Sequence, residues 1–200
     1  MNVVIADYGA GNLRSVVSAL RRAGAEADIT TDPADVRDAP LAVIAGVGHV
    51  ERAARGLAAT GLDEALCERA ASGRPVLGIC VGMQLLFEES EEGGAGLGLL
   101  AGPVVRLRAR RVPHMGWNAL QATRPSALLA GVEGADVYFA HSYAVMPSDP
   151  SVAAASVDHD GPVVAIVEQG PLAGVQFHPE RSGPTGARIL ENALAWSRSV

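Results

Sequence analysis

In the first half of the chain, short apolar runs alternate with segments whose apolar residues recur at helical spacing. Runs of the first kind predict buried strands, and segments of the second kind predict amphipathic helices. In chain order the predicted elements are strand 3–7, helix 13–23, strand 27–30, strand 41–45, helix 62–71, a strand from Val76 and a helix from Met83. This alternation predicts a mainly parallel sheet with helices on both faces.

Three predicted turns, at residues 8–12, 46–48 and 78–82, follow strands of this sheet. Ligands of such sheets bind at the carboxyl ends of the strands. We therefore expect the three turns to converge on one site.

The second half of the chain has a different pattern, in which short apolar runs are separated by turn residues. The runs are at 104–107, 116–121, 137–140, 143–145, 152–157, 163–167 and 172–176. They predict antiparallel strands added to the parallel core. A final amphipathic helix is predicted at 185–197. With no repeat and no linker, the pattern predicts one mixed α/β domain over residues 1–200.

Composition narrows the function classes. The formal net charge is −6, which argues against general nucleic-acid binding. The basic run at Arg106, Arg108, Arg110 and Arg111 is interpreted first as a solvated strand face and second as an anion or partner contact. No apolar run has membrane-spanning length, and the chain opens into a predicted strand without a secretory signal. Two cysteines form no disulfide framework. We expect a soluble cytoplasmic protein.

Cys80 lies at the most informative turn of the chain. Gly78-Ile79-Cys80-Val81-Gly82 joins the strand that starts at Val76 to the next predicted helix. Two glycines allow a cramped turn that exposes its central residue, as in the Gly-x-Ser-x-Gly nucleophile elbow. A thiolate at a helix N-terminus is also favoured by the helix dipole. The alternative is a small buried core cysteine.

His178 and Glu180 supply the groups that a thiol nucleophile needs. They follow the last predicted strand in Phe177-His178-Pro179-Glu180. Histidine can take the thiol proton and return it to a leaving group, and a carboxylate can fix its tautomer. The backbone N–H groups of Val81 and of the Gly46-Val47-Gly48 turn are candidate oxyanion donors. These groups predict amide or ester hydrolysis through a thioester.

The other histidines and Cys67 have weaker claims to chemistry. His49 and His159 are expected to be solvated, and His114 and His141 to be hydrogen-bonded structural residues. No histidine pair has metal-ligand spacing, so no metal site is expected. No cofactor is expected either. Cys67 is expected to be a packing residue.

A glycine-rich turn at residues 9–14 raises a dinucleotide-binding alternative. Arg14 stands where the third glycine of that fingerprint belongs. A turn with a structural or partner-contact role is favoured instead.

Several motifs together resemble a known family along nearly the whole chain. The cysteine turn with His178-Pro179-Glu180 resembles the class I (triad) glutamine amidotransferases, which release ammonia from glutamine. Within that class, four further segments resemble the glutaminase subunits of imidazole glycerol phosphate synthase. They are residues 7–15, Pro113-His114-Met115-Gly116-Trp117-Asn118, His141-Ser142-Tyr143 and Arg181-Ser182-Gly183.

The resemblance implies a role for each matching position. Cys80 would be the nucleophile, His178 the base and acid, and Glu180 its orienting partner. The residues implied around the substrate, L-glutamine, and its oxyanion are Gly48, Val81, Gln84, Glu92, Ser142 and Tyr143. The residues implied to face a (β/α)8-barrel cyclase subunit are Asn12, Trp117, Tyr138 and Arg181. That heterodimer would use the ammonia to make imidazole glycerol phosphate in histidine biosynthesis.

The sequence departs from the family pattern at two positions, and two alternatives stay open. Ala45 stands where proline usually precedes the Gly-Val-Gly turn, and Arg181 stands where lysine is common. A glutaminase of another synthase, such as that for anthranilate or pyridoxal phosphate, is one alternative. A catalytically silent binding subunit is the other, and the intact Cys80, His178 and Glu180 argue against it.

Overall fold

The computed structural model describes residues 1–9 and 11–200, and its centre is an eight-stranded sheet. Five neighbouring strands run parallel and three antiparallel strands extend one edge. In spatial order the strands are β2 (Glu26–Thr30), β1 (Asn2–Ala6), β3 (Leu41–Gly46), β4 (Val76–Cys80), β12 (Leu172–Val175), β11 (Pro162–Gln169), β10 (Ala153–Asp158) and β7 (Gln121–Ala122). The mixed, mainly parallel fold class predicted from the sequence is confirmed.

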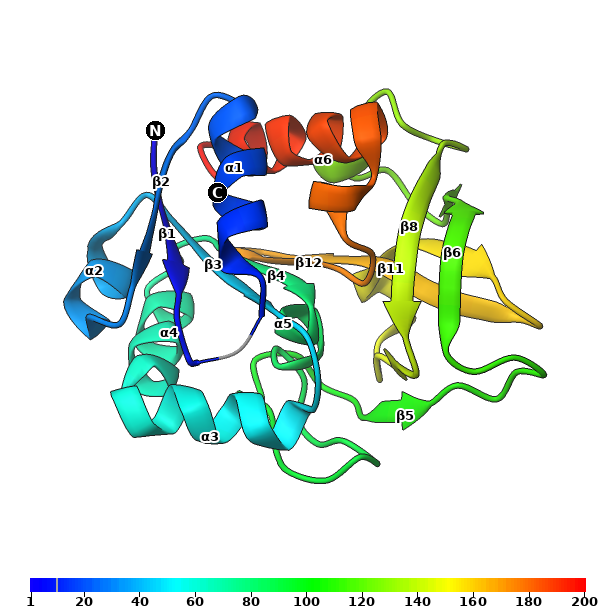
Figure 1. The fold of residues 1–200 in the computed structure, drawn as a ribbon, viewed down its shortest axis with the longest axis horizontal. Helices are drawn as coiled ribbons and strands as arrows, with labels where there is room; N and C mark the ends of the chain where they lie inside the picture. The colour runs from blue at the N-terminus through cyan, green and yellow to red at the C-terminus, as the bar shows by residue number, and fades with distance from the viewer. Residues whose placement is uncertain (10) are drawn as a thin grey trace.

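Helices cover both faces of the parallel part of the sheet. Figure 1 shows α1 and α6 together on one side, with α3 and α4 on the other. The helices are α1 (Leu13–Arg22), α2 (Pro33–Asp38), α3 (Val50–Thr60), α4 (Leu62–Ala71), α5 (Val81–Gln84) and α6 (Gly183–Trp196). The central strands β3 and β4 are buried at every position. Strands buried on both faces lack alternating polar residues, which is why the sequence shows continuous apolar runs there.

The second half corrects part of the sequence prediction. Two pairs of its strands lie outside the main sheet: β5 (Val104–Arg106) with β9 (Tyr143–Val145), and β6 (His114–Ala119) with β8 (Asp136–His141). Strand β12, predicted as an antiparallel addition, pairs parallel with β4. A local pattern identifies a strand but does not show which distant strand it will pair with, so the pairing was missed.

The helical predictions need two further corrections. Helices α2 and α3 were not predicted: α2 has only six residues, and α3 buries three side chains, one of them the small Ala53. The helix after Cys80 is a single turn, α5. Leu85, Leu86 and Phe87 are buried beyond it, and their carbonyls accept hydrogen bonds from the backbone of residues 97–100. Helical spacing of apolar residues there reflects packing in a folded loop.

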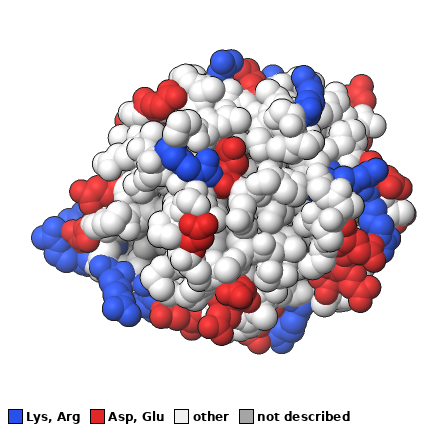
Figure 2. All heavy atoms as spheres, turned by 180° about the vertical axis from the view of Figure 1, so that it is seen from behind, with Lys and Arg blue, Asp and Glu red and all other residues white. Residues whose placement is uncertain are grey.

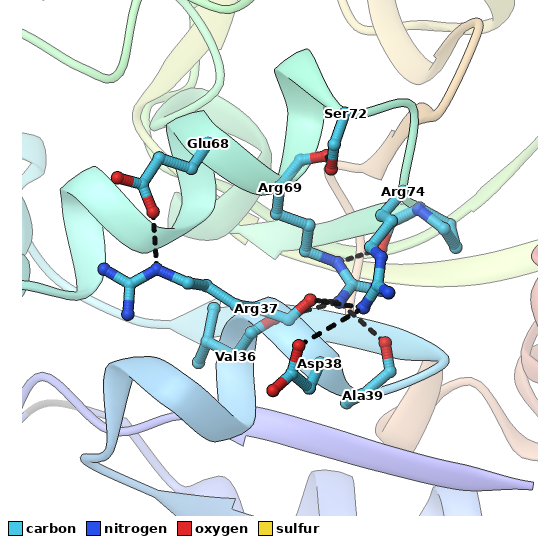
Figure 3. A network of polar contacts seen from close by, with 9 residues as sticks. Val36, Arg37, Asp38, Ala39, Glu68, Arg69, Ser72 and Arg74 are labelled. Atoms are coloured by element: carbon cyan, nitrogen blue, oxygen red, sulfur yellow. Dashed lines mark hydrogen bonds and ion pairs between the residues drawn. The ribbon is translucent and has the colours of Figure 1, made fainter.

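A buried arginine ties α4 to the start of β4 (Figure 3). Arg69 is 1% exposed, and its guanidinium donates to the carbonyls of Pro75 at 2.9 Å, Val36 at 2.8 Å and Ala39 at 2.7 Å. Burial lowers the pKa of Arg69 to about 10, so the side chain stays charged at neutral pH. Because Pro75 leads directly into β4, this clamp fixes the base of the strand that carries Cys80.

The surface mixes charges of both signs. Figure 2 shows acidic and basic side chains interleaved around the margin of the face opposite to that of Figure 1. Arg106, Arg108, Arg110 and Arg111 are all exposed, as expected, but only Arg106 lies in a strand, so they do not form the predicted strand face. Among the helices of the described residues, none is both long enough and apolar enough to cross a membrane.

Candidate functional site

Cys80 occupies a strained turn between β4 and α5. Its backbone has φ 56° and ψ −111°, a conformation that side chains with a Cβ rarely adopt. The neighbouring glycines make room for the turn: a Cβ on Gly82 would lie 1.8 Å from the carbonyl oxygen of Ile44, and one on Gly78 would lie 2.5 Å from that of Gly82. The predicted elbow geometry is therefore present, with the cysteine at the head of the helical turn.

His178 and Glu180 lie beside this turn because β12 and β4 are parallel neighbours. Val175 of β12 pairs with Ile79 of β4, so the chain leaves both strands at the same edge of the sheet. His178 Nδ1 lies 2.9 Å from Glu180 Oε1, and the two side chains are only 7% and 8% exposed. Burial by itself lowers the pKa of His178, but hydrogen bonds to Cys80 and Glu180 outweigh burial and raise that pKa above its ordinary value. The structure thus brings all three residues together.

Gln176 also reaches Cys80, although no role for it was predicted from the sequence. Its side chain is fully buried, and its Nε2 donates to Cys80 Sγ at 3.7 Å. The available signal was a polar residue inside the apolar run that ends at Phe177.

A cleft of about 430 Å³ opens beside Cys80. It contains every residue that the family resemblance placed around glutamine: Gly48, Val81, Gln84, Glu92, Ser142 and Tyr143. Arg106 lines the same cleft, a position that was not predicted to belong to it. Gln84 is 3% exposed, and its Nε2 donates to the Tyr143 carbonyl at 2.9 Å and to Gln176 Oε1 at 3.0 Å. Gln84 therefore forms the buried wall of the cleft.

Glu92 anchors the turn that follows β3. One carboxylate oxygen lies 2.8 Å from His49 Nδ1, and the other accepts the Val50 N–H at 3.2 Å. Gly48 in this turn has φ 100°, which glycine adopts without strain. His49 was expected to be solvated; its side chain is 69% exposed but is held by Glu92.

A cluster of three histidines adjoins the cleft, whose wall includes His141. His114 Nδ1 and His141 Nε2 are 3.0 Å apart and both residues are buried, as predicted for structural histidines. Burial lowers the pKa of each to about 4, with the neighbouring histidines contributing in the same direction. His159 was expected to be solvated; it is half-buried, stacks on His114 at a ring distance of 4.0 Å, and its Nε2 contacts the Arg111 carbonyl.

The residues implied to face a cyclase fall into two groups. Trp117 on β6 is 57% exposed and contacts Tyr138 on β8 edge-on, with ring centroids 5.9 Å apart. Asn12 and Arg181 line a second cleft of about 210 Å³, together with His178 and Glu180. The two clefts share Val47 and Ala140 in their walls, so they adjoin near Cys80.

The glycine-rich turn at residues 9–14 and Cys67 do not form a second functional site in the described residues. In the glycine-rich turn at residues 9–14, Gly9 and Gly11 have positive φ, Gly11 packs near Gly46, and Ala10 lies outside the described residues. Cys67 is partly buried in α4. Over residues 1–9 and 11–200, no cluster of three or more His, Cys, Asp or Glu side chains is arranged to hold a metal ion.

Solved structures share this fold over nearly the whole chain. A structure described as a glutamine amidotransferase superposes with a TM-score of 0.80 at 20% identity, covering 98% of each chain. A chain of the structure described as PurLQS from Thermotoga maritima superposes with a TM-score of 0.73 at 20% identity, again covering 98% of each chain. At this identity the likeness establishes the fold alone.

Sequence comparison establishes the family. The family described as Glutamine amidotransferase class-I matches residues 4–196. Imidazole glycerol phosphate synthase subunit HisH of Geobacillus sp. (strain WCH70) is 48% identical over 197 residues, covering 94% of this chain and 93% of that protein. The protein of the same name from Symbiobacterium thermophilum is 47% identical over 202 residues, covering 99% of this chain and 94% of that protein. The chain therefore belongs to the class-I glutamine amidotransferases and, among them, to the HisH subunits of imidazole glycerol phosphate synthase.

Proposed function

We propose that Cys80, His178 and Glu180 are the catalytic residues of this glutamine amidotransferase. The observation that carries the proposal is the strained cysteine turn with a buried His178–Glu180 pair beside it. Cys80 gives its thiol proton to His178. The resulting thiolate sulfur attacks the side-chain amide carbon of glutamine, and the carbonyl π electrons move to the oxygen. The N–H groups of Val81 and of the Gly48 turn then face the oxyanion. Collapse of this intermediate breaks the C–N bond.

His178 moves the protons in both halves of the reaction. As imidazolium it gives a proton to the departing nitrogen, which leaves as ammonia and a γ-glutamyl thioester on Cys80. As neutral imidazole it then takes a proton from water while the water oxygen attacks the thioester, which releases glutamate and restores Cys80. Glu180 Oε1, at 2.9 Å from Nδ1, holds the proton on Nδ1 and keeps Nε2 available for this exchange.

The cleft beside Cys80 has the charges that glutamine requires. Arg106 lies in its wall and suits the α-carboxylate, and Glu92 suits the α-ammonium group. The Glu92 carboxylate also holds His49 and the Val50 N–H. Substrate contact at Glu92 is thereby linked to the turn that carries the Gly48 oxyanion donor. Ser142 and Tyr143 complete this wall, and Gln84 donates a hydrogen bond to the Tyr143 carbonyl.

We further propose that the partner of this synthase subunit is a (β/α)8-barrel cyclase that receives the ammonia. The names of the relatives support a synthase of two or more subunits. The second cleft supports a route for ammonia, because it adjoins the first near Cys80 and is lined by Asn12, Arg181 and the catalytic pair. The exposed Trp117 beside Tyr138 extends the same partner-facing region. We infer that residues 1–200 act as one amidotransferase domain in this assembly, since β12 near the C-terminus lies inside the sheet built by the N-terminal strands.

The proposal is tested by glutamate production from the purified chain, alone and with a cyclase subunit, with and without the cyclase's nucleotide ligand. A low rate alone that rises with cyclase and ligand is expected. The matched variant Cys80→Ala, assembled with cyclase, is expected to lose synthesis from glutamine and to retain synthesis from added ammonium salts. Glutamate production that does not depend on the cyclase would count against this partner. Loss of the ammonium-dependent reaction in an intact complex would overturn the division of labour.

A further inference from the structure

A chain of buried hydrogen bonds links the nucleophile to the sheet formed by β6 and β8. It begins at Cys80 Sγ, which accepts from Gln176 Nε2 at 3.7 Å. Gln176 Oε1 accepts from Gln84 Nε2 at 3.0 Å, and the same nitrogen donates to the Tyr143 carbonyl at 2.9 Å. The Tyr143 carbonyl also faces His141 Nδ1 at 2.8 Å.

The chemistry of these groups fixes the direction of every bond. A backbone carbonyl only accepts, so the Gln84 atom facing Tyr143 must be its NH2 group. The Gln84 NH2 then donates to Gln176 through its second hydrogen, which places the Gln176 oxygen toward Gln84. The NH2 group of Gln176 is left facing the sulfur.

The tautomers of the histidine pair are fixed in the same way. His141 must donate from Nδ1 to the Tyr143 carbonyl, so in the neutral ring Nε2 is an acceptor. His114 must therefore donate from Nδ1 to His141 Nε2, across the 3.0 Å between them. The lowered pKa values of both histidines keep the two rings neutral near pH 7, as this arrangement requires.

We propose that Gln176 is a positioning residue for Cys80, and that the His114–His141 pair fixes the Gln176 amide through Tyr143 and Gln84. The N–H of Gln176 stabilises the sulfur anion and holds it at the end of β4. This inference rests on the proposed role of Cys80 as nucleophile.

The arrangement also makes the β6–β8 sheet a support for both reacting groups. His114 lies on β6 and His141 on β8. The β8 carbonyl of Tyr138 accepts the backbone N–H of His178 at 2.9 Å. The sheet that presents Trp117 to solvent thus contacts the base through its backbone and the nucleophile through the hydrogen-bond chain.

The test measures the alkylation rate of Cys80 by iodoacetamide against pH, resolved from Cys67 by peptide mass spectrometry. Gln176→Met fills a similar volume without a donor. The midpoint of the Cys80 profile is expected to rise by about one pH unit, which corresponds to about 1.4 kcal/mol. Gln169→Met, the same change at an exposed position of β11, is the control and is expected to leave the midpoint unchanged.

A second arm tests the chain from its far end. His114→Phe keeps the ring stacked on Phe139 but cannot donate to His141. It is expected to raise the midpoint by less than Gln176→Met does. In the double variant Gln176→Met/His114→Phe it is expected to add no further rise, because Gln176→Met has already broken the hydrogen-bond chain. Full additivity, or a folded Gln176→Met with the midpoint of the control, would overturn the proposal. If Gln176→Met does not fold, an unmoved midpoint in His114→Phe overturns it.

Alkylation requires neither glutamine nor a partner. The alkylation profile therefore tests the positioning role of Gln176, and glutamate production tests the proposed glutaminase reaction, so either can fail without the other.

Discussion

Replacing Cys80 by glycine is expected to cost no more stability than replacing it by alanine. In a helix or strand, glycine is usually the more destabilising of the two. The reason is the backbone at this residue, where φ is 56° and ψ is −111°. Strained conformations of residues that carry a Cβ cost about 1–3 kcal/mol, and glycine relieves that cost. Both replacements remove the thiol, so the comparison isolates the Cβ.

The magnitude follows from three opposing contributions. Glycine relieves about 2 kcal/mol of strain, loses about 0.5–1 kcal/mol through its greater chain entropy, and forfeits about 0.8 kcal/mol from the buried methyl group. The net difference at position 80 is therefore between about 0 and 1 kcal/mol in favour of glycine. Cys67 offers a matched control because it lies inside α4. At position 67 the alanine variant is expected to have a free energy of unfolding about 1 kcal/mol higher than that of the glycine variant.

Urea unfolding of the four variants, Cys80→Gly, Cys80→Ala, Cys67→Gly and Cys67→Ala, measures both differences. The glycine-minus-alanine difference is expected to be about 1–2 kcal/mol more favourable to glycine at position 80 than at position 67. Equal differences at the two positions would refute the claim that the turn at Cys80 stores strain.

Two further predictions concern buried ionisable side chains. Arg69→Met is expected to lower the free energy of unfolding by about 3 kcal/mol, because the carbonyls of Val36 and Ala39 lose the guanidinium donor and that of Pro75 keeps only the Ala42 N–H. Urea unfolding checks this, and a loss below about 1 kcal/mol would contradict the clamp. Stability is also expected to fall as pH drops from about 6.5 to about 4, because the unfolded state binds protons that His114 and His141, with pKa values of about 4, do not. A His114→Phe/His141→Phe variant whose pH profile is no flatter than that of the wild type would contradict this assignment.

Cys80, His178 and Glu180 could be predicted from the sequence because each lies in a short segment whose own residues determine its local geometry. The Gly78-to-Gly82 turn predicts its own geometry because only glycine fits beside Ile44 and the α5 backbone. His178 and Glu180 are two residues apart, so one turn can bring them into contact. The alternation of strands and helices in the first half likewise predicts the parallel sheet.

Long-range pairing accounts for most of what could not be predicted from the sequence. The convergence of Cys80 and His178 depends on β12 pairing with β4. The residues within each strand show that it is a strand, but they do not show which strand it pairs with. The same holds for Gln176, whose polar side chain inside an apolar strand end was visible but whose partner Cys80 was not. His159 has a polar local sequence, yet β6 places His114 against its ring.

The central claim is that Cys80 carries the glutamyl group during turnover, and acid quenching during glutamine hydrolysis tests it most directly. The chain, assembled with a cyclase and its ligand, is mixed with labelled glutamine, quenched and digested, and the peptides are mapped by mass spectrometry. The account predicts a glutamyl thioester on the peptide that contains Cys80, released by hydroxylamine and absent from Cys80→Ala. Steady glutamate production with no label on that peptide, or label that persists in Cys80→Ala, would contradict it.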